Sequence, residues 1–238
     1  YPYWKDHFVC PGEAALTLAP GRYEYEVERG PEWIAASGAF EAATGAPTDV
    51  PVALERIVDL RTEGWWSGDL HVHRPPEDID LLMQAEDLDV APVITWWNGK
   101  SRWADRDGAG AGVGGKVPLP LPENPSIRFA DGRLSHLMGG EDERAGGALL
   151  YFNLARPLAL PLSNARTEHP SPMVYVDEAR RQSERRGPEP PPTGRQSGVW
   201  IDIEKPFWWD VPVWLASGKI DSIGLANNHM CRSTMHES

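Results

Sequence analysis

The chain has 238 residues, of which 41% are hydrophobic and 24% charged, and its formal net charge is −12 at pH 7. A chain of this length can bury a hydrophobic core, and no run of its sequence approaches the roughly 20 apolar residues that a membrane-spanning helix needs. The negative charge opposes binding to phosphate backbones. We therefore expect a soluble globular protein that acts on a small molecule, with no nucleic-acid partner and no membrane span.

The two cysteines, Cys10 and Cys231, lie near opposite ends of the chain. They do not form the dense framework of a disulfide-stapled secreted domain. The sequence therefore leaves the cellular compartment open, an extracytoplasmic one included, and it leaves the oligomeric state open as well.

The first part of the chain alternates apolar and polar residues, as a half-buried β-strand does. A turn at Pro20-Gly21 separates two such segments, residues 16–18 and 23–27, which predicts a hairpin. Further alternation over residues 50–54 extends the pattern. We expect residues 1–60 to form a small antiparallel β-sandwich module.

From residue 64 onward, short apolar runs alternate with amphipathic stretches, which is typical of buried parallel strands followed by covering helices. Strands are predicted at residues 70–73, 91–95, 149–154, 199–203 and 222–226, and helices at residues 76–89, 174–184 and around 212–217. A stretch rich in glycine and proline, residues 107–125, predicts a loop or flap. Because the last residues look like an interrupted loop, we expect residues 61–238 to form an α/β domain that is truncated at its C-terminus.

A histidine pair, His71 and His73, stands at the end of the first of these strands. Residues two apart in a strand point the same way, which suits two ligands of one metal ion. Asp69, two residues earlier, is a candidate for a catalytic role or for holding one histidine in its tautomer. A pair with this spacing is often incidental, but these two histidines fall where a strand meets a loop, the usual place of a site in α/β folds.

The segment Gly68-Asp69-Leu70-His71-Val72-His73, with a strand before it and a helix and an Ile-Thr strand end after it, resembles the first motif of the polymerase-and-histidinol-phosphatase (PHP) superfamily. The CehA/McbA-like metallohydrolases are the most similar branch, and in that branch a small β-sandwich module precedes the motif. The resemblance implies a distorted β/α barrel with up to three metal ions, commonly zinc or manganese, at the C-terminal ends of its strands.

The later motifs of that family match only in part. Where the family has Thr-Asp-His at a strand end, this chain has Thr95-Trp96-Trp97. A glutamate that follows a glycine and bridges metals in the family matches Glu141. A later strand of the family ends in His-Pro, whereas Lys205 precedes the proline here. The last family motif, Asp-x-His, would lie beyond a segment like residues 220–228.

These departures predict a reduced site rather than a trinuclear one. His71 and His73, with one or two of Glu141, Glu204 and His229 as further ligands, would leave coordination positions open for water and substrate. An ion held in this way activates water near neutral pH. Zinc and manganese are the expected ions.

Each of the less secure residues also has an ordinary structural interpretation. Lys205 either stabilises negative charge on a substrate oxygen, as a catalytic residue, or is a lysine in a structural salt bridge. Glu141 stands among charged residues that could form a solvated turn, and His229 could be an ordinary loop histidine. Glu204 ends an apolar strand, where a buried carboxylate is costly without a function.

Three tryptophan doublets each flank a predicted strand: Trp65-Trp66, Trp96-Trp97 and Trp208-Trp209. They either wall a pocket for an aromatic or sugar ligand, or cap the core or the contact between the two modules.

The sequence thus predicts a metal-dependent hydrolase that uses metal-activated water on a phosphoester or on a carbamate or amide-like ester. The alternative is a non-catalytic PHP-like binding module for a carbohydrate or surface ligand, with a degenerate metal site. A third possibility is an N-terminal portion whose site is completed by residues outside the chain. The natural substrate is not predicted.

Overall fold

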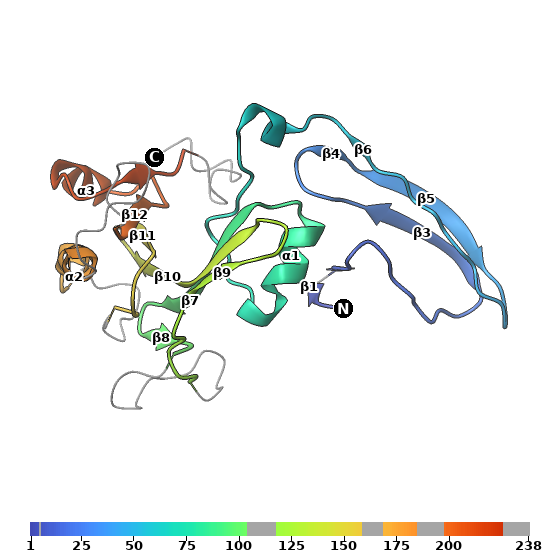
Figure 1. Cartoon of the computed structure of the whole chain (residues 1–238), viewed down its shortest axis with the longest axis horizontal. Coiled ribbons are helices and arrows are strands. Elements are labelled where there is room, and N and C mark those ends of the chain that lie inside the picture. The colour runs from blue at the N-terminus through green and yellow to red at the C-terminus, as the bar shows by residue number, and fades with distance from the viewer. Residues whose placement is uncertain (5, 104–117, 159–168, 185–197, 226–238) are drawn as a thin grey trace. The chain divides into compact units, whose positions relative to one another are not determined.

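The computed structural model describes the chain except residues 5, 104–117, 159–168, 185–197 and 226–238 (Figure 1). The chain divides into two compact units. The first unit contains Tyr1–Leu70, Pro75–Ala91 and Arg128–Ser135, and the second contains His71–Arg74, Pro92–Ile127 and His136–Ser238. The architecture is mixed α/β, with many strands and few helices.

The first unit contains small antiparallel strand pairs. The pairs are β1 (Tyr3–Trp4) with β2 (His7–Phe8), β3 (Gly21–Val27) with β5 (Ala36–Ala42), and β4 (Trp33–Ile34) with β6 (Glu55–Arg56). Along β3 and β5, exposed residues alternate with partly buried ones, as the sequence pattern predicts. The partly buried face carries Tyr23 and Phe40, whose ring centroids lie 5.6 Å apart.

Antiparallel pairing in residues 1–60 is therefore confirmed, but the predicted hairpin partner is wrong. Residues 13–19 have no regular structure, and β3 pairs with β5 instead of with residues 16–18. Residues 50–54 also form no strand. Alternation shows that a segment can lie half-buried in a sheet, but it does not specify the partner, which depends on contacts distant in sequence.

The second unit is built on a seven-stranded mixed sheet in the order β13-β12-β11-β10-β7-β8, with β9 also paired to β10. Its strands are β7 (Val90–Trp97), β8 (Lys100–Ser101), β9 (Ser126–Arg128), β10 (Leu134–Arg144), β11 (Gly147–Phe152), β12 (Trp200–Ile203) and β13 (Ser222–Ile223). The pairs β10–β11 and β11–β12 are antiparallel, whereas β12 and β13 are parallel. The first residues of β7 and β10 belong to the first unit.

The described strands do not close into the barrel that the family resemblance implies. The sheet runs from an edge at β13 to an edge at β8, and β10 and β11 follow one another as an antiparallel hairpin. An intervening helix, which a parallel β/α repeat requires, has no room between Arg144 and Gly147. The coarser prediction of an α/β architecture is confirmed.

The predicted helices are present. They are α1 (Ile79–Ala85), which follows a 3₁₀ turn at Pro76–Asp78, then α2 (Pro172–Glu184) and α3 (Val211–Ala216), and a further 3₁₀ turn spans Leu60–Glu63. The first helix ends before the predicted residue 89, because Asp87 has a positive φ of 55° that a helix cannot contain.

Strands predicted at 91–95, 149–154, 199–203 and 222–226 correspond to β7, β11, β12 and β13. The described part of the predicted loop, residues 118–125, forms no regular strand or helix.

The core of the second unit packs around Trp96. This side chain is 1% exposed and its ring centroid lies 5.7 Å from that of Tyr151. Any Cβ atom at Gly140 would overlap the indole ring, so the glycine permits the close contact between β7 and β10. Trp96 is thus a core residue and does not wall a ligand pocket.

Candidate metal centre

The two histidines lie on a short segment that runs beside β7. Val72, between them, forms a parallel bridge with Val93 and accepts a 2.8 Å hydrogen bond from the backbone amide of Ile94. Val72 is buried, whereas the side chains of His71 and His73 are 27% and 40% exposed. The two imidazole rings lie together, with centroids 4.9 Å apart, as the two-residue spacing predicts.

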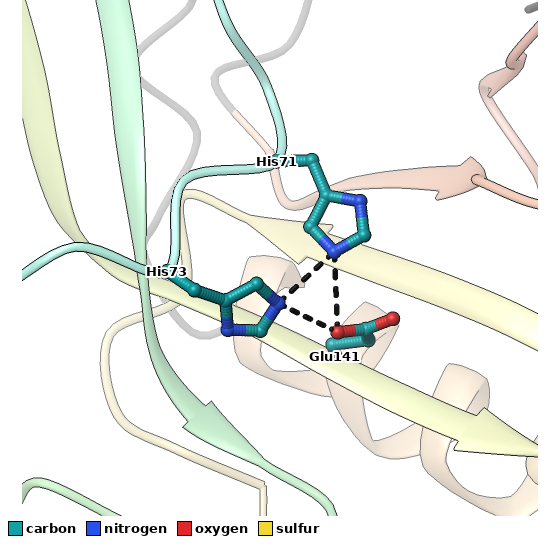
Figure 2. A group of neighbouring side chains, drawn as sticks. All are labelled: His71, His73 and Glu141. Carbon is teal, nitrogen blue, oxygen red and sulfur yellow. Dashed lines mark hydrogen bonds and ion pairs between the residues drawn. The ribbon is translucent and has the colours of Figure 1, made fainter. Parts of the chain in front are cut away.

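Glu141 comes to the same place from β10 (Figure 2). It is 1% exposed, and its backbone carbonyl accepts a hydrogen bond from the amide of Asn98 at 2.9 Å. Its strand position is opposite Leu150 of β11. The alternative of a solvated turn around Glu141 is therefore wrong.

The run of charged residues in β10 is divided between the two faces of the sheet. Alternation places Glu141 and Glu143 on one face, and Asp142 and Arg144 on the other. Asp142 and Arg144 pair at 2.7 Å with their side chains 1% exposed, which compensates both buried charges. Burial raises the pKa of Asp142, and Arg144 opposes that rise.

Three possible ligand atoms lie close together. Nε2 of His73 lies 3.0 Å from Nε2 of His71 and 3.0 Å from Oε2 of Glu141. The third side of the triangle, from Nε2 of His71 to Oε2 of Glu141, is 3.3 Å (Figure 2). Ligands of a tetrahedral zinc ion with bonds of about 2.0–2.1 Å are about 3.3 Å apart. The donor types and spacing therefore fit a divalent ion, and the three residues form a possible metal-binding group.

Charge is strongly coupled within this triangle. Burial lowers the pKa of His71, but hydrogen bonds to Glu141 and Glu204 outweigh burial and raise that pKa to about 10. Burial raises the pKa of Glu141, but hydrogen bonds to His71 and His73 lower it to about 2. Without a metal ion, a proton on His71 thus provides positive charge that Glu141 stabilises.

Glu204 contacts the opposite edge of the His71 ring. Its Oε1 lies 3.1 Å from Nδ1 of His71, and the residue is 6% exposed at the end of β12. A carboxylate at Nδ1 holds the proton on that nitrogen and leaves the Nε2 lone pair for a metal ion. The predicted burial of Glu204 is confirmed, and its contact is with the histidine rather than with the three-atom triangle.

Lys205 is also buried, with 4% exposure. Its Nζ forms an ion pair with Glu143 and lies 3.7 Å from Oε1 of Glu141 and 3.8 Å from Oε2 of Glu204. These contacts favour the ion-paired interpretation of Lys205 over direct contact with a substrate.

Asp69 and His229 are the two remaining predicted residues. Asp69 belongs to the first unit, where it is exposed and its backbone amide donates to the carbonyl of Val90. His229 lies outside the described residues.

Sequence reasoning did not single out Glu143 or Asn98. Glu143 follows Glu141 by two residues, a spacing that would have placed both on one face once β10 was recognised as a strand. Asn98 has a positive φ of 49°, and its Oδ1 accepts a 2.9 Å hydrogen bond from the amide of Glu143. It connects the end of β7 to the strand that carries the glutamates.

Trp97 lies beside His73, with ring centroids 5.3 Å apart, and is 38% exposed.

Within the described part of the chain, no helix is both long and apolar enough to cross a bilayer. Comparisons with protein-family models, with curated proteins and with solved structures find no match to this chain. A function is therefore inferred from the geometry of the site.

Proposed function

We propose that this chain is a metal-dependent hydrolase in which His71, His73 and Glu141 bind a divalent ion, zinc or manganese. The observation that carries the proposal is the convergence of two Nε2 atoms and one carboxylate oxygen within 3.0–3.3 Å of one another. The resemblance of residues 68–73 to the first PHP motif supports a hydrolytic reaction class. Phosphoesters and carbamate or amide-like esters are the proposed substrates.

The residues around the group have separable tasks in this proposal. A divalent ion bound by two histidines and a carboxylate supplies Lewis acidity, which activates water near neutral pH and polarises the scissile group. Glu204 fixes the orientation and tautomer of His71 through the 3.1 Å contact at Nδ1. Lys205 is near Oε1 of Glu141, which leaves Oε2 directed at the histidines.

Access to the group is from the side of His73, whose side chain is 40% exposed. Trp97 borders this side, and a wide aromatic ring provides a flat surface for a planar part of a substrate. We therefore place the scissile group near the triangle and an aryl or similarly flat substituent against Trp97.

A second candidate function belongs to the first unit. Trp65 and Trp66 are 67% and 72% exposed, and they border a cavity of about 1340 Å³ together with charged residues. Exposed tryptophans beside polar groups suit the faces and hydroxyls of sugars, which favours carbohydrate binding there. Loss of glycan-array binding on Trp65→Ala/Trp66→Ala substitution would support this candidate, and absence of binding by the unsubstituted protein would reject it.

The hydrolase proposal is tested by assay of the zinc-loaded and manganese-loaded protein against aryl phosphates and aryl carbamates. Turnover is expected for one class, with loss of at least about 100-fold on Glu141→Gln, because the ligand set is then broken. His7→Ala, which changes an exposed histidine of the first unit, provides the matched control and is expected to keep full activity. Metal-loaded protein that turns over neither class would contradict the proposal.

A further inference from the structure

We propose that the ammonium group of Lys205 occupies a second cation position beside the metal-binding triangle and thereby limits the centre to one divalent ion. This inference rests on the proposed metal centre and specifies its nuclearity and its built-in counter-ion.

The first support is the surroundings of Nζ. The side chain of Lys205 is 5% exposed, and its ammonium forms an ion pair with Glu143 and lies within 3.8 Å of Glu141 and Glu204. A single ammonium is therefore enclosed by three carboxylates that come from β10 and the end of β12. Carboxylate oxygens gathered in this way are also the ligands that a hard divalent cation takes.

The second support is that one of these carboxylates, Glu141, spans both positions. Glu141 directs Oε2 at the histidines and Oε1 at Lys205, at 3.0 Å and 3.7 Å respectively. Glu204 directs Oε2 at Lys205, at 3.8 Å, but its Oε1 lies 3.1 Å from Nδ1 of His71, on the ring edge away from the triangle. In centres that hold two metal ions about 3.5–4 Å apart, a carboxylate can bridge the two cations in the way that Glu141 does here. Here the second cation is an amino acid side chain.

The third support is the balance of charge. Three carboxylates directly contact the lysine or the histidines, and the lysine neutralises one of them. One divalent ion neutralises the other two when both histidines are neutral, as metal ligation by Nε2 requires. A second divalent ion would leave an excess of positive charge in a site whose glutamates are mostly buried, which is strongly unfavourable.

Removal of the ammonium is therefore expected to open the second position to a metal ion. Lys205→Ala leaves the three carboxylates and a space between them, whereas Lys205→Arg keeps a cation and is the matched control. Zinc and manganese stoichiometry after dialysis is expected to be about one ion per chain for the unsubstituted protein and for Lys205→Arg, and about two for Lys205→Ala. Electron paramagnetic resonance of the manganese-loaded Lys205→Ala protein should show exchange coupling, because Glu141 bridges the two ions and places them close together.

The Lys205→Ala variant also tests the inference if it does not fold without added metal ions. Without a counter-ion, the buried carboxylates of Glu141 and Glu204 and the partly buried carboxylate of Glu143 repel one another, so this variant is expected to depend on added ions for folding. Circular dichroism during a zinc titration measures how many ions restore the fold. Restoration at about two ions per chain supports the inference. Failure of any divalent ion to restore the fold would overturn it.

Two further outcomes separate the role of Lys205 from the existence of the metal centre. A Lys205→Ala protein that is folded and holds one ion, with unchanged affinity, would overturn the role of Lys205 but leave the metal centre intact. An unsubstituted protein that binds no ion would remove the metal centre and the proposed function with it.

Discussion

Nδ1 of His71 lies 3.1 Å from Oε1 of Glu204, and this contact sets which nitrogen of the imidazole faces Glu141 and His73. When the imidazole is neutral, Glu204 holds its proton on Nδ1, and the Nε2 lone pair is left for a metal ion on the side of Glu141 and His73. In the proposed centre, Glu204 thus supports His71 without being one of the three possible ligands.

The first prediction concerns this contact. Glu204→Ala is expected to weaken zinc affinity by about 10–100-fold, because His71 loses the group that holds its tautomer and orientation. Glu204→Gln should lose less, since its amide oxygen can still accept the Nδ1 proton. Competition titrations with a chromophoric chelator measure both variants. Equal affinities for Glu204→Ala and the unsubstituted protein would show that the contact does not support the centre.

Metal affinity should depend strongly on pH. In the metal-free protein the pKa of His71 is raised to about 10, since hydrogen bonds to Glu141 and Glu204 overcome the effect of burial, which alone lowers it. A metal ion must displace this proton, so its apparent affinity is expected to rise about tenfold per pH unit between about pH 7 and pH 9. Calorimetry in buffers of different ionisation enthalpy should detect close to one proton released per ion. An affinity that is flat over this range would contradict a protonated His71 in the metal-free site.

Gly140→Ala is expected to damage the fold next to Glu141. The added methyl group would overlap the indole of Trp96, which is 1% exposed. Overpacking of this kind costs about 1–3 kcal/mol of unfolding free energy. Thermal and urea denaturation measure the loss, and Trp96→Phe in the Gly140→Ala background should recover part of it. Full recovery is not expected, because the smaller ring leaves other contacts unfilled.

Trp97 should determine a preference for flat ligands. Hydroxamates bind zinc through their polar end, so benzohydroxamate is expected to bind the zinc-loaded protein more tightly than acetohydroxamate, by stacking on Trp97. A contact worth about 0.5–1.5 kcal/mol corresponds to a factor of about 2–10. Trp97→Ala should remove this factor and leave zinc affinity unchanged, whereas Trp209→Ala, at a tryptophan that is 69% exposed, should preserve it. Equal preference in all three proteins would reject stacking on Trp97.

Local patterns in the sequence predicted a substantial part of this structure. The apolar runs at β7, β11 and β12 and the amphipathic stretches at α1, α2 and α3 have the expected type and approximate position. The two-residue spacing of His71 and His73 correctly placed both rings on one side, because alternation in an extended segment depends only on the local backbone.

Features that depend on distant contacts could not be predicted in the same way. The charged run Glu141–Arg144 resembles a solvated turn, and it lies inside a sheet because Asp142 and Arg144 neutralise each other on one face while Lys205 neutralises glutamates on the other. Lys205 is 62 residues from Glu143 in sequence, so no local pattern connects them. For the same reason, the partner of β3 emerged only from the structure.

Metal content tests the central claim most directly. Purified protein, loaded with zinc or manganese and dialysed, is expected to retain about one ion per chain, and His71→Ala and Glu141→Gln should retain far less, because each removes one of three ligands. His7→Ala should match the unsubstituted protein. Less than about half an ion per chain in the unsubstituted protein, unaffected by His71→Ala, would contradict the metal centre.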